Sequence, residues 1–301
     1  MTLQTRTAVV TEAHRRYDVE AIPNDLMPRD DSGAVGVLLR PAFHAETLLR
    51  YEPRTRTITM SAYARSLWYL VAELCNPAPT TKERLVEKYR GVTAPPPAIE
   101  IWSETAAIGT GAAAIDGGLV AAFRRAEAEG GPRHGVDGIS LRGFCFEGGD
   151  ESRFEAWSPT FDSEAHRFVH LLYRCARESL RSDEVEQRLE ELHGYLGLGL
   201  PWKVVSETPL VIRIFGSLSA SDEPELRRAL DGLPRTEPVV LDLSRLAGMG
   251  SLLHPVWRSW LQERDNVLWV VGDDIARHLD SIGVSAGARH PDLASALREL
   301  R

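Results

Sequence analysis

The serine near the centre of the segment DLSRLAGMGSLLHPVW, residues 242–257, is placed where reversible chemistry could act on protein binding. The segment reads as a strand end, a tight turn and a helix start, and Ser251 falls in the turn. A phosphate on such a serine would add up to about two negative charges beside a helix N-terminus, which can make or break the docking of another protein. Ser251 is therefore a candidate phosphoacceptor, and the alternative is an ordinary turn or helix-capping serine.

The sequence HRFVH places His166 and His170 one helical turn apart, a spacing that suits two metal ligands. No glutamate follows the first histidine as it does in H-E-x-x-H, and no third ligand is evident. We expect two partly exposed histidines on an amphipathic helix, and no metal site.

The segment GTGAAAIDGG, residues 109–118, contains a G-x-G-x-x-A spacing that cradles phosphate in dinucleotide-binding folds. The preceding EIWSETAA is a poor buried strand, and Asp116, Gly117 and Gly118 interrupt the helix that such a site needs. We therefore expect a flexible loop here and no bound cofactor.

Three carboxylates, Glu147, Asp150 and Glu151, lie near a predicted hairpin tip, where paired acids could bind metal or transfer protons. Loop tips are normally polar, so we expect these carboxylates to be solvated. The cysteines are Cys75, Cys145 and Cys175, and they form no C-x-x-C pair. Their spacing argues against a disulfide scaffold or a zinc site and favours a reducing, cytoplasmic environment.

Residues 1–197 predict an α+β domain with a strand-rich middle. The first 30 residues are polar and irregular, and three strand candidates follow in residues 35–62. Residues 65–74 are a short helix or a buried strand, and a short helix is expected at 81–89. A helix over 117–129 is followed by a hairpin over 138–158 that turns at Gly148, Gly149 and Asp150. Two helices then begin at Asp162 or Ser163 and at Ser182.

Residues 198–301 predict an α/β domain with a mixed sheet flanked by helices. Three apolar strands, LVIRIFG, PVVLDLS and NVLWVVG, alternate with helices in SDEPELRRALDGL, HPVWRSWLQERD, DDIARHLDSIG and HPDLASALREL. WKVVSE, residues 202–207, is expected to add an antiparallel edge strand.

Residues 202–301 resemble a STAS domain, the fold of bacterial anti-sigma-factor antagonists and of sulfate-transporter tails. IRIFGSLS resembles the strand that runs into a Gly-Glu-Leu-Asp-like turn in that family, and VVLDLSRLAGM resembles its central strand. GSLL falls at the family's Asp-Ser-Ser-Gly-Leu segment, and NVLWVVGDDIARHLDSIGV and HPDLASALREL are similar to its last strand and helices. The resemblance lies in the order and spacing of these segments together.

The resemblance implies a domain that does no chemistry and binds a partner protein, such as a serine kinase, a sigma-factor regulator or a transport subunit. It also implies that Ser251 occupies the place of the phosphorylated serine of the switching members. The surroundings depart from the family pattern, because Gly250 replaces the preceding acid and Ser219 replaces an expected Asp. Pro255 suits the first helical position, which would make His254 the cap; alternatively, Ser251 is the cap.

The departures favour a degenerate STAS-like domain that is retained as a binding module and is not a working phospho-switch. The turn would then offer a docking surface for the partner, and core packing is the alternative for each of its residues. The candidate partner-binding residues are Met249, Leu252, Leu253, His254 and Trp257.

Composition sets the remaining expectations for the 301-residue chain. Its net charge of −8 and the absence of a basic run argue against nucleic-acid binding, and no apolar run is long enough for membrane insertion. We expect a non-catalytic regulatory or assembly protein of a bacterial cytoplasm, whose N-terminal domain is a sensor, a partner-binding domain or a dimerisation element. The alternatives are an enzyme with its site in residues 30–197, regulated by the STAS-like domain, and a cytoplasmic subunit of a transport complex.

Overall fold

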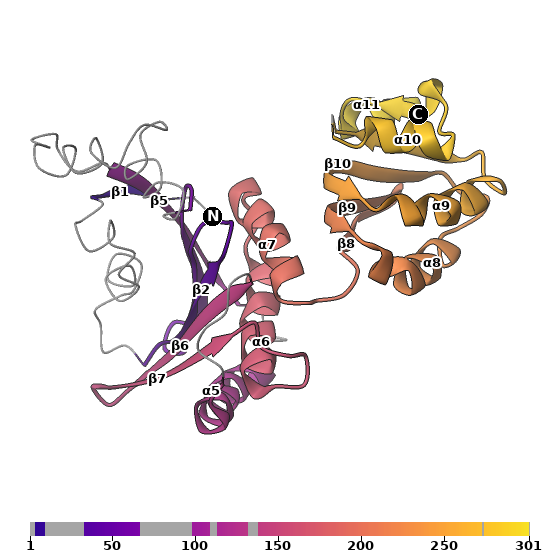
Figure 1. The fold of residues 1–301 in the computed structure, drawn as a ribbon. Coiled ribbons are helices and arrows are strands. Elements are labelled where there is room, and N and C mark those ends of the chain that lie inside the picture. The colour runs from indigo at the N-terminus through magenta and orange to yellow at the C-terminus, as the bar shows by residue number, and fades with distance from the viewer. Residues whose placement is uncertain are drawn as a thin grey trace, which may run out of the picture. The chain divides into compact units, whose positions relative to one another are not determined.

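The computed structural model describes residues 4–9, 33–66, 98–108, 113–131, 138–272 and 274–300. The chain divides into two compact units, Met1–Leu196 (unit 1) and Gly197–Arg301 (unit 2), and Figure 1 traces both along the sequence. The boundary predicted from the sequence, after residue 197, lies one residue from this division.

Unit 1 is built on an antiparallel sheet whose order, over the described residues, is β1-β5-β4-β3-β2-β6-β7. Gly148 and Gly149 have φ angles of 62° and 95°, which allow the two-residue turn that joins the last two strands. The strands are β1 (Gln4–Val9), β2 (Val35–Pro41), β3 (Thr47–Glu52), β4 (Thr57–Tyr63), β5 (Ala98–Ala107), β6 (Ile139–Glu147) and β7 (Asp150–Trp157).

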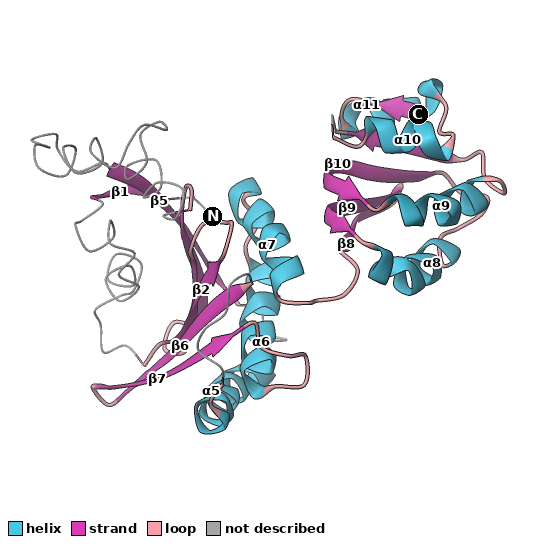
Figure 2. Cartoon of the chain, in the orientation of Figure 1, coloured by secondary structure: helices cyan, strands magenta, loops and turns pink. Residues whose placement is uncertain are grey.

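Three helices, α5 (Ala113–Glu129), α6 (Glu164–Ser179) and α7 (Asp183–Tyr195), lie on one face of this sheet (Figure 2). Phe168 of α6 packs against Phe123 of α5 and Phe154 of β7, with ring centroids 5.7 and 5.6 Å apart. A Cβ on Gly143 would lie only 2.0 Å from the ring of Phe154. Glycine at this position therefore makes room for the aromatic cluster that joins helices to sheet.

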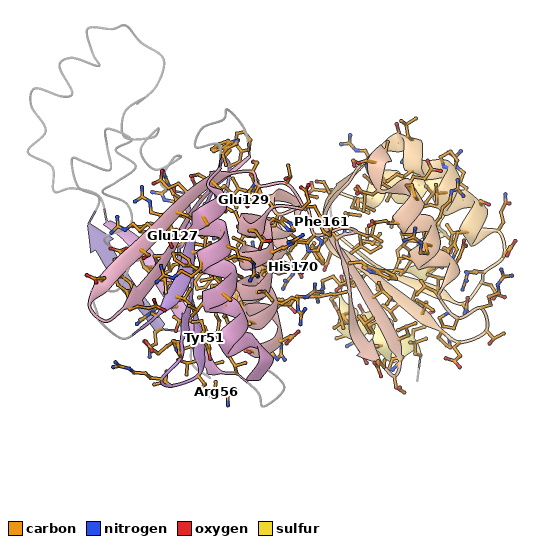
Figure 3. All side chains as sticks on the ribbon, turned by 90° about the horizontal axis from the view of Figure 1, so that it is seen from below. Tyr51, Arg56, Glu127, Glu129, Phe161 and His170 are labelled. Atoms are coloured by element: carbon orange, nitrogen blue, oxygen red, sulfur yellow. The ribbon has the colours of Figure 1, made fainter. Side chains whose placement is uncertain are left out.

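The ends of α6 and α7 are fixed by side chains from neighbouring elements. Ser163 and Ser182 are the N-caps of these helices. The hydroxyl of each serine accepts a hydrogen bond from the backbone amide three residues later, that of His166 or Val185. Glu129, at the end of α5 (Figure 3), accepts a hydrogen bond from the amide of Glu164 at 2.7 Å. Both predicted cap positions are confirmed, with Ser163 in place of the alternative Asp162.

A buried carboxylate ties the start of α7 to the sheet. Glu104 of β5 is 1% exposed, and its two oxygens accept hydrogen bonds from the amides of Arg181 and Ser182 at 2.9 and 3.0 Å. These amides belong to the turn before the helix, so one side chain supplies the acceptors for two backbone donors.

Replacing Glu104 with alanine is expected to lower the free energy of unfolding of unit 1 by about 2–3 kcal/mol, since two part-buried amides lose their acceptor. Pulsed hydrogen exchange during urea unfolding reports on the two units separately and checks this value. Glu100→Ala is the matched control, because Glu100 lies on the same strand with an exposed side chain. Equal losses in the two variants would contradict the capping role of Glu104.

Unit 2 contains a mixed sheet whose order, over the described residues, is β12-β11-β10-β9-β8. β8 pairs antiparallel with β9, and the other neighbours are parallel. The strands are β8 (Trp202–Glu207), β9 (Leu210–Leu218), β10 (Val239–Met249), β11 (Val267–Val271) and β12 (Arg289–His290), and the helices are α8 (Glu223–Asp231), α9 (His254–Leu261), α10 (Ala276–Ile282) and α11 (Leu293–Glu299).

The two faces of this sheet are covered by different helices. One face holds the main core, to which α8, α9 and α10 contribute buried side chains such as Leu226, Trp257 and Leu279. On the other face, Val211, Val240 and Val270 pack against α11. Successive residues of β10 alternate between the faces, as the period of two along a strand requires.

Several elements differ from the sequence-based expectations. The sequence does not predict β1 or β12. EIWSETAA has the pattern of a poor buried strand, yet it forms most of β5 because it pairs on both sides, with β1 and β4. α5 begins four residues before the predicted start, so Asp116, Gly117 and Gly118 do not interrupt it. β10 runs on to Met249 instead of ending near Ser244. The expected helix over 81–89 and nearly all of 65–74 lie outside the described residues, as does Cys75.

Candidate functional site

Ser251 lies at the carboxyl ends of two parallel strands, which is the edge where open α/β sheets usually place their sites. β10 ends at Met249, and the amide of Gly250 donates to the carbonyl of Leu218 at the end of β9 at 2.8 Å. A 3₁₀ turn, Ser251–Leu253, then leads directly into α9. The ends of β9 and β10 are thus held side by side.

The turn that follows β9 completes this edge. A capping box joins Ser219 and Asp222, and the amide of Ser219 donates to the Asp222 carboxylate at 2.6 Å. A Cβ on Gly250 would lie 3.7 Å from the amide nitrogen of Ala220. The backbones of residues 218–222 and 249–254 therefore lie side by side, and we call their exposed side chains the strand-end surface.

The cap of α9 differs from both sequence-based alternatives. His254 is the first residue of the helix and Pro255 lies in its first turn, as the preference of proline predicts. Leu253 is the capping residue, whereas Ser251 opens the preceding 3₁₀ turn and is exposed. Ser251 is thus a turn residue outside α9.

Three of the five candidate docking residues belong to the core of unit 2. Met249 is 5% exposed, and Leu253 and Trp257 are fully buried. Leu253 and Trp257 are four residues apart and share the inward face, where Trp257 contacts Trp260 and Trp269 at centroid distances of 6.1 and 5.6 Å. The alternative of core packing therefore holds for these three residues.

Leu252 and His254 remain on the strand-end surface. Leu252 is 71% exposed, the largest value among the exposed large apolar side chains described in unit 2. His254 is half-buried, and its Nε2 lies 2.9 Å from Nδ1 of His278 on α10. His278 was missed by the sequence analysis, because its contact joins two helices that are distant in sequence.

The environment of His254 disfavours its charged form. Partial burial is the main cause that lowers the pKa of His254, and the neighbouring His278 and Arg258 lower it further. His254 also lies at a helix N-terminus, where the helix dipole opposes a cation. The neutral imidazole is therefore the form that this site favours at neutral pH.

The DLS motif of β10 has a structural role. The Asp242 side chain is 1% exposed and accepts from Arg213 Nε at 2.7 Å, while its other oxygen accepts from the amide and hydroxyl of Ser244. The pairing of β10 with β9 is irregular just beyond this point. Asp242 thus fixes the local register instead of offering a reactive group.

The predicted sites of unit 1 do not converge on a ligand. His166 is 3% exposed and bonds the carbonyl of Leu196 through Nε2 at 2.7 Å. Its ring lies between those of Phe161 and His170, both labelled in Figure 3, at centroid distances of 5.3 and 6.0 Å. The expectation that both histidines are partly exposed is therefore wrong for His166, whereas His170 is partly exposed. Over the residues that the structure describes, no three His, Cys, Asp or Glu side chains group as metal ligands.

The carboxylates of the β6–β7 hairpin bind separate arginines. Glu147 pairs with Arg124 of α5, and Glu151 pairs with Arg153 of its own strand. Cys145 is buried, which raises its pKa to about 11 and keeps the thiol protonated at neutral pH. Residues 109–112 of the glycine motif lie outside the described residues.

A charged hollow lies between α8 and α9. Its arginines are occupied: Arg227 pairs with Glu223, Arg235 pairs with Glu263, and Arg264 donates to the carbonyls of Leu233 and Pro234. These contacts satisfy the cations within the fold, so the hollow is a weaker candidate than the strand-end surface.

Comparison with known proteins assigns no family. No protein-family model matches the chain, and no curated protein matches it significantly. Among the helices described, none is long and apolar enough to cross a membrane.

Proposed function

We propose that this chain is a regulatory or assembly protein without chemistry of its own, and that unit 2 binds a partner protein through the strand-end surface. The alternation of strands and helices in unit 2 supports the resemblance to a STAS domain on which this proposal draws. In this proposal Ser251 is a turn residue and is not phosphorylated. The switching members of the STAS family carry acidic residues at the positions of Gly250 and Ser219, and this chain lacks them.

The exposure of Leu252 is the observation that carries the proposal. Its neighbours Met249 and Leu253 are buried, so the turn projects one apolar side chain from between two residues that pack in the core. A preorganised apolar side chain binds a complementary pocket with little loss of conformational entropy. The hydroxyls of Ser219 and Ser251 and the Asp222 carboxylate, on the same strand-end surface, would form a polar rim, as protein interfaces commonly have.

Leu252→Ala is expected to reduce partner binding at least about tenfold, which corresponds to about 1.4 kcal/mol. The stability of unit 2 should change by less than about 0.5 kcal/mol, because the side chain is mostly exposed. The measurement is quantitative affinity capture of the full chain from the cells that naturally express it, with partners identified by mass spectrometry.

Val204→Ala is the matched control, since Val204 is 54% exposed on β8 in the same unit. It should capture the same partner in the same amount as the unchanged chain. Equal capture by both variants would contradict a role for the strand-end surface. Turnover of a small molecule by the purified chain, without a partner, would favour an enzyme with its site in residues 30–197.

A further inference from the structure

His254 and His278 form a direct imidazole pair at the strand-end surface. Nε2 of His254 lies 2.9 Å from Nδ1 of His278, and the rings meet edge to face at 79°. One ring must present an N–H and the other a lone pair. The pair therefore joins the first residue of α9 to the third residue of α10, directly after the turn that carries Leu252.

The pair accepts one proton more easily than two. A first added proton can enter the donor ring at its other nitrogen, and the N–H···N bond then becomes charge-assisted. A second proton would place N–H groups and positive charges on both sides of the same contact. Protonation of both rings would therefore remove the lone pair that accepts the N–H···N bond between them.

The surrounding charges also oppose the second proton. Arg258, one turn along α9, donates from two nitrogens to the carbonyl of Ser281 on α10 at 2.9 and 2.7 Å. Among the neighbouring acids, Asp222 is engaged by Ser219, and Asp280 pairs with Arg289. Asp274 and Arg277, which lie beside His278 in sequence, are exposed. Both histidines also lie in the first turns of their helices, where the dipole disfavours a cation.

We propose that the imidazole pair is a pH-responsive latch that holds the strand-end surface in its binding form near neutral pH and releases it in acid. The second protonation separates His254 from His278, which loosens the start of α9 and the adjoining Ser251–Leu253 turn. The consequence for partner binding rests on the proposed function, whereas the latch itself is a property of unit 2 alone.

The sign of the stability effect follows from the lowered pKa of His254. The unfolded chain binds the proton more readily than the folded chain does, so the contribution of this group is fully present above the ordinary histidine pKa of about 6.5. This stabilising contribution is lost as the pH falls below that value, and the loss is complete once the pH is below the pKa of His254 in the folded chain. A fall in pH therefore lowers the free energy of unfolding of unit 2 over the same pH range in which it separates His254 from His278.

Nuclear magnetic resonance of the full chain, labelled at histidine Cε1 and leucine methyl groups, tests the latch without any partner. As the pH is lowered from 7.5 to 5, the Leu252 methyl signals should shift together with the Cε1 signals of His254 and His278. His278→Gln should reduce that Leu252 shift, because the amide oxygen of glutamine can accept a hydrogen bond from a protonated His254 without a second positive charge. His290→Gln should retain the shift, since His290 lies on β12 beside Glu299.

Leu252 methyl signals that stay constant while the Cε1 signal of His254 changes would overturn the latch. Partner capture at pH 7.5 and 5.5 separates it from the proposed function. If the methyl titration behaves as expected but Leu252→Ala captures as much partner as the unchanged chain, the latch stands and the proposed function fails. If binding depends on Leu252 but not on pH, the proposed function stands and the latch fails.

Discussion

Replacing Asp242 with leucine is expected to lower the free energy of unfolding of unit 2 by about 3–5 kcal/mol, the range for breaking a buried ion pair at one partner. The carboxylate is 1% exposed, and the Arg213 side chain that it binds is 13% exposed. The variant removes the compensating charge of a largely buried guanidinium and the acceptor of two hydrogen bonds from Ser244. Urea unfolding with pulsed hydrogen exchange, read on peptides of residues 197–301, measures the loss.

Two controls separate burial from charge in this prediction. The double variant Asp242→Leu, Arg213→Met should recover most of the lost stability, because an apolar pair can replace a buried ion pair at little cost. Glu263→Ala removes the exposed pair with Arg235, whose side chains are 64% and 72% exposed, and should cost less than about 1 kcal/mol. A loss of that size at Asp242 as well would show that the buried pair has no special role.

Replacing Trp257 with alanine should lower the free energy of unfolding of unit 2 by about 3–5 kcal/mol, the usual range for truncating a large buried aromatic side chain. The ring is fully buried against Trp260 and Trp269. Its Nε1 has no hydrogen-bond acceptor within the described part of the chain, so packing accounts for the loss. Trp257→Phe should cost much less, because phenylalanine retains most of the apolar contact.

Leu252→Ala, five residues earlier, is the matched comparison for Trp257→Ala. Both remove an apolar side chain near the same turn, but only Trp257 lies in the core. Loss of partner binding with unchanged stability in Trp257→Ala would mean that this ring is exposed in solution, and the assignment of the docking surface to Leu252 would be wrong.

Local sequence signals predicted most regular elements correctly. Ser163 and Ser182 cap their helices where a capping serine precedes an amphipathic pattern, and the Gly148–Gly149 pair turns the predicted hairpin. The antiparallel edge strand β8 and the alternating elements of unit 2 also follow the predicted order. These features depend on short-range chemistry, which a single sequence displays.

The features that sequence analysis missed depend on long-range contacts. β5 carries polar residues, and its Glu104 is buried only because the turn at Arg181 and Ser182 meets it from 77 and 78 residues away. The same limitation applies to His254 and His278, which are 24 residues apart.

Within the candidate site, the sequence located the turn but did not separate its inward from its outward residues. Met249, Leu252 and Leu253 are all apolar, and no periodic pattern continues from a strand through a 3₁₀ turn into a helix. The structure assigns Met249 and Leu253 to the core and leaves Leu252 exposed. The burial of each residue in this turn follows from tertiary packing.

Site-specific photocrosslinking of the full chain tests the central claim most directly. A p-benzoylphenylalanine placed at position 252, at 204 or at 161 replaces an exposed apolar residue of the strand-end surface, of β8 or of unit 1. The proposed function predicts a covalent adduct with one partner protein from position 252 and none from the other two. Adducts with that partner from position 161 or 204, and none from 252, would contradict it.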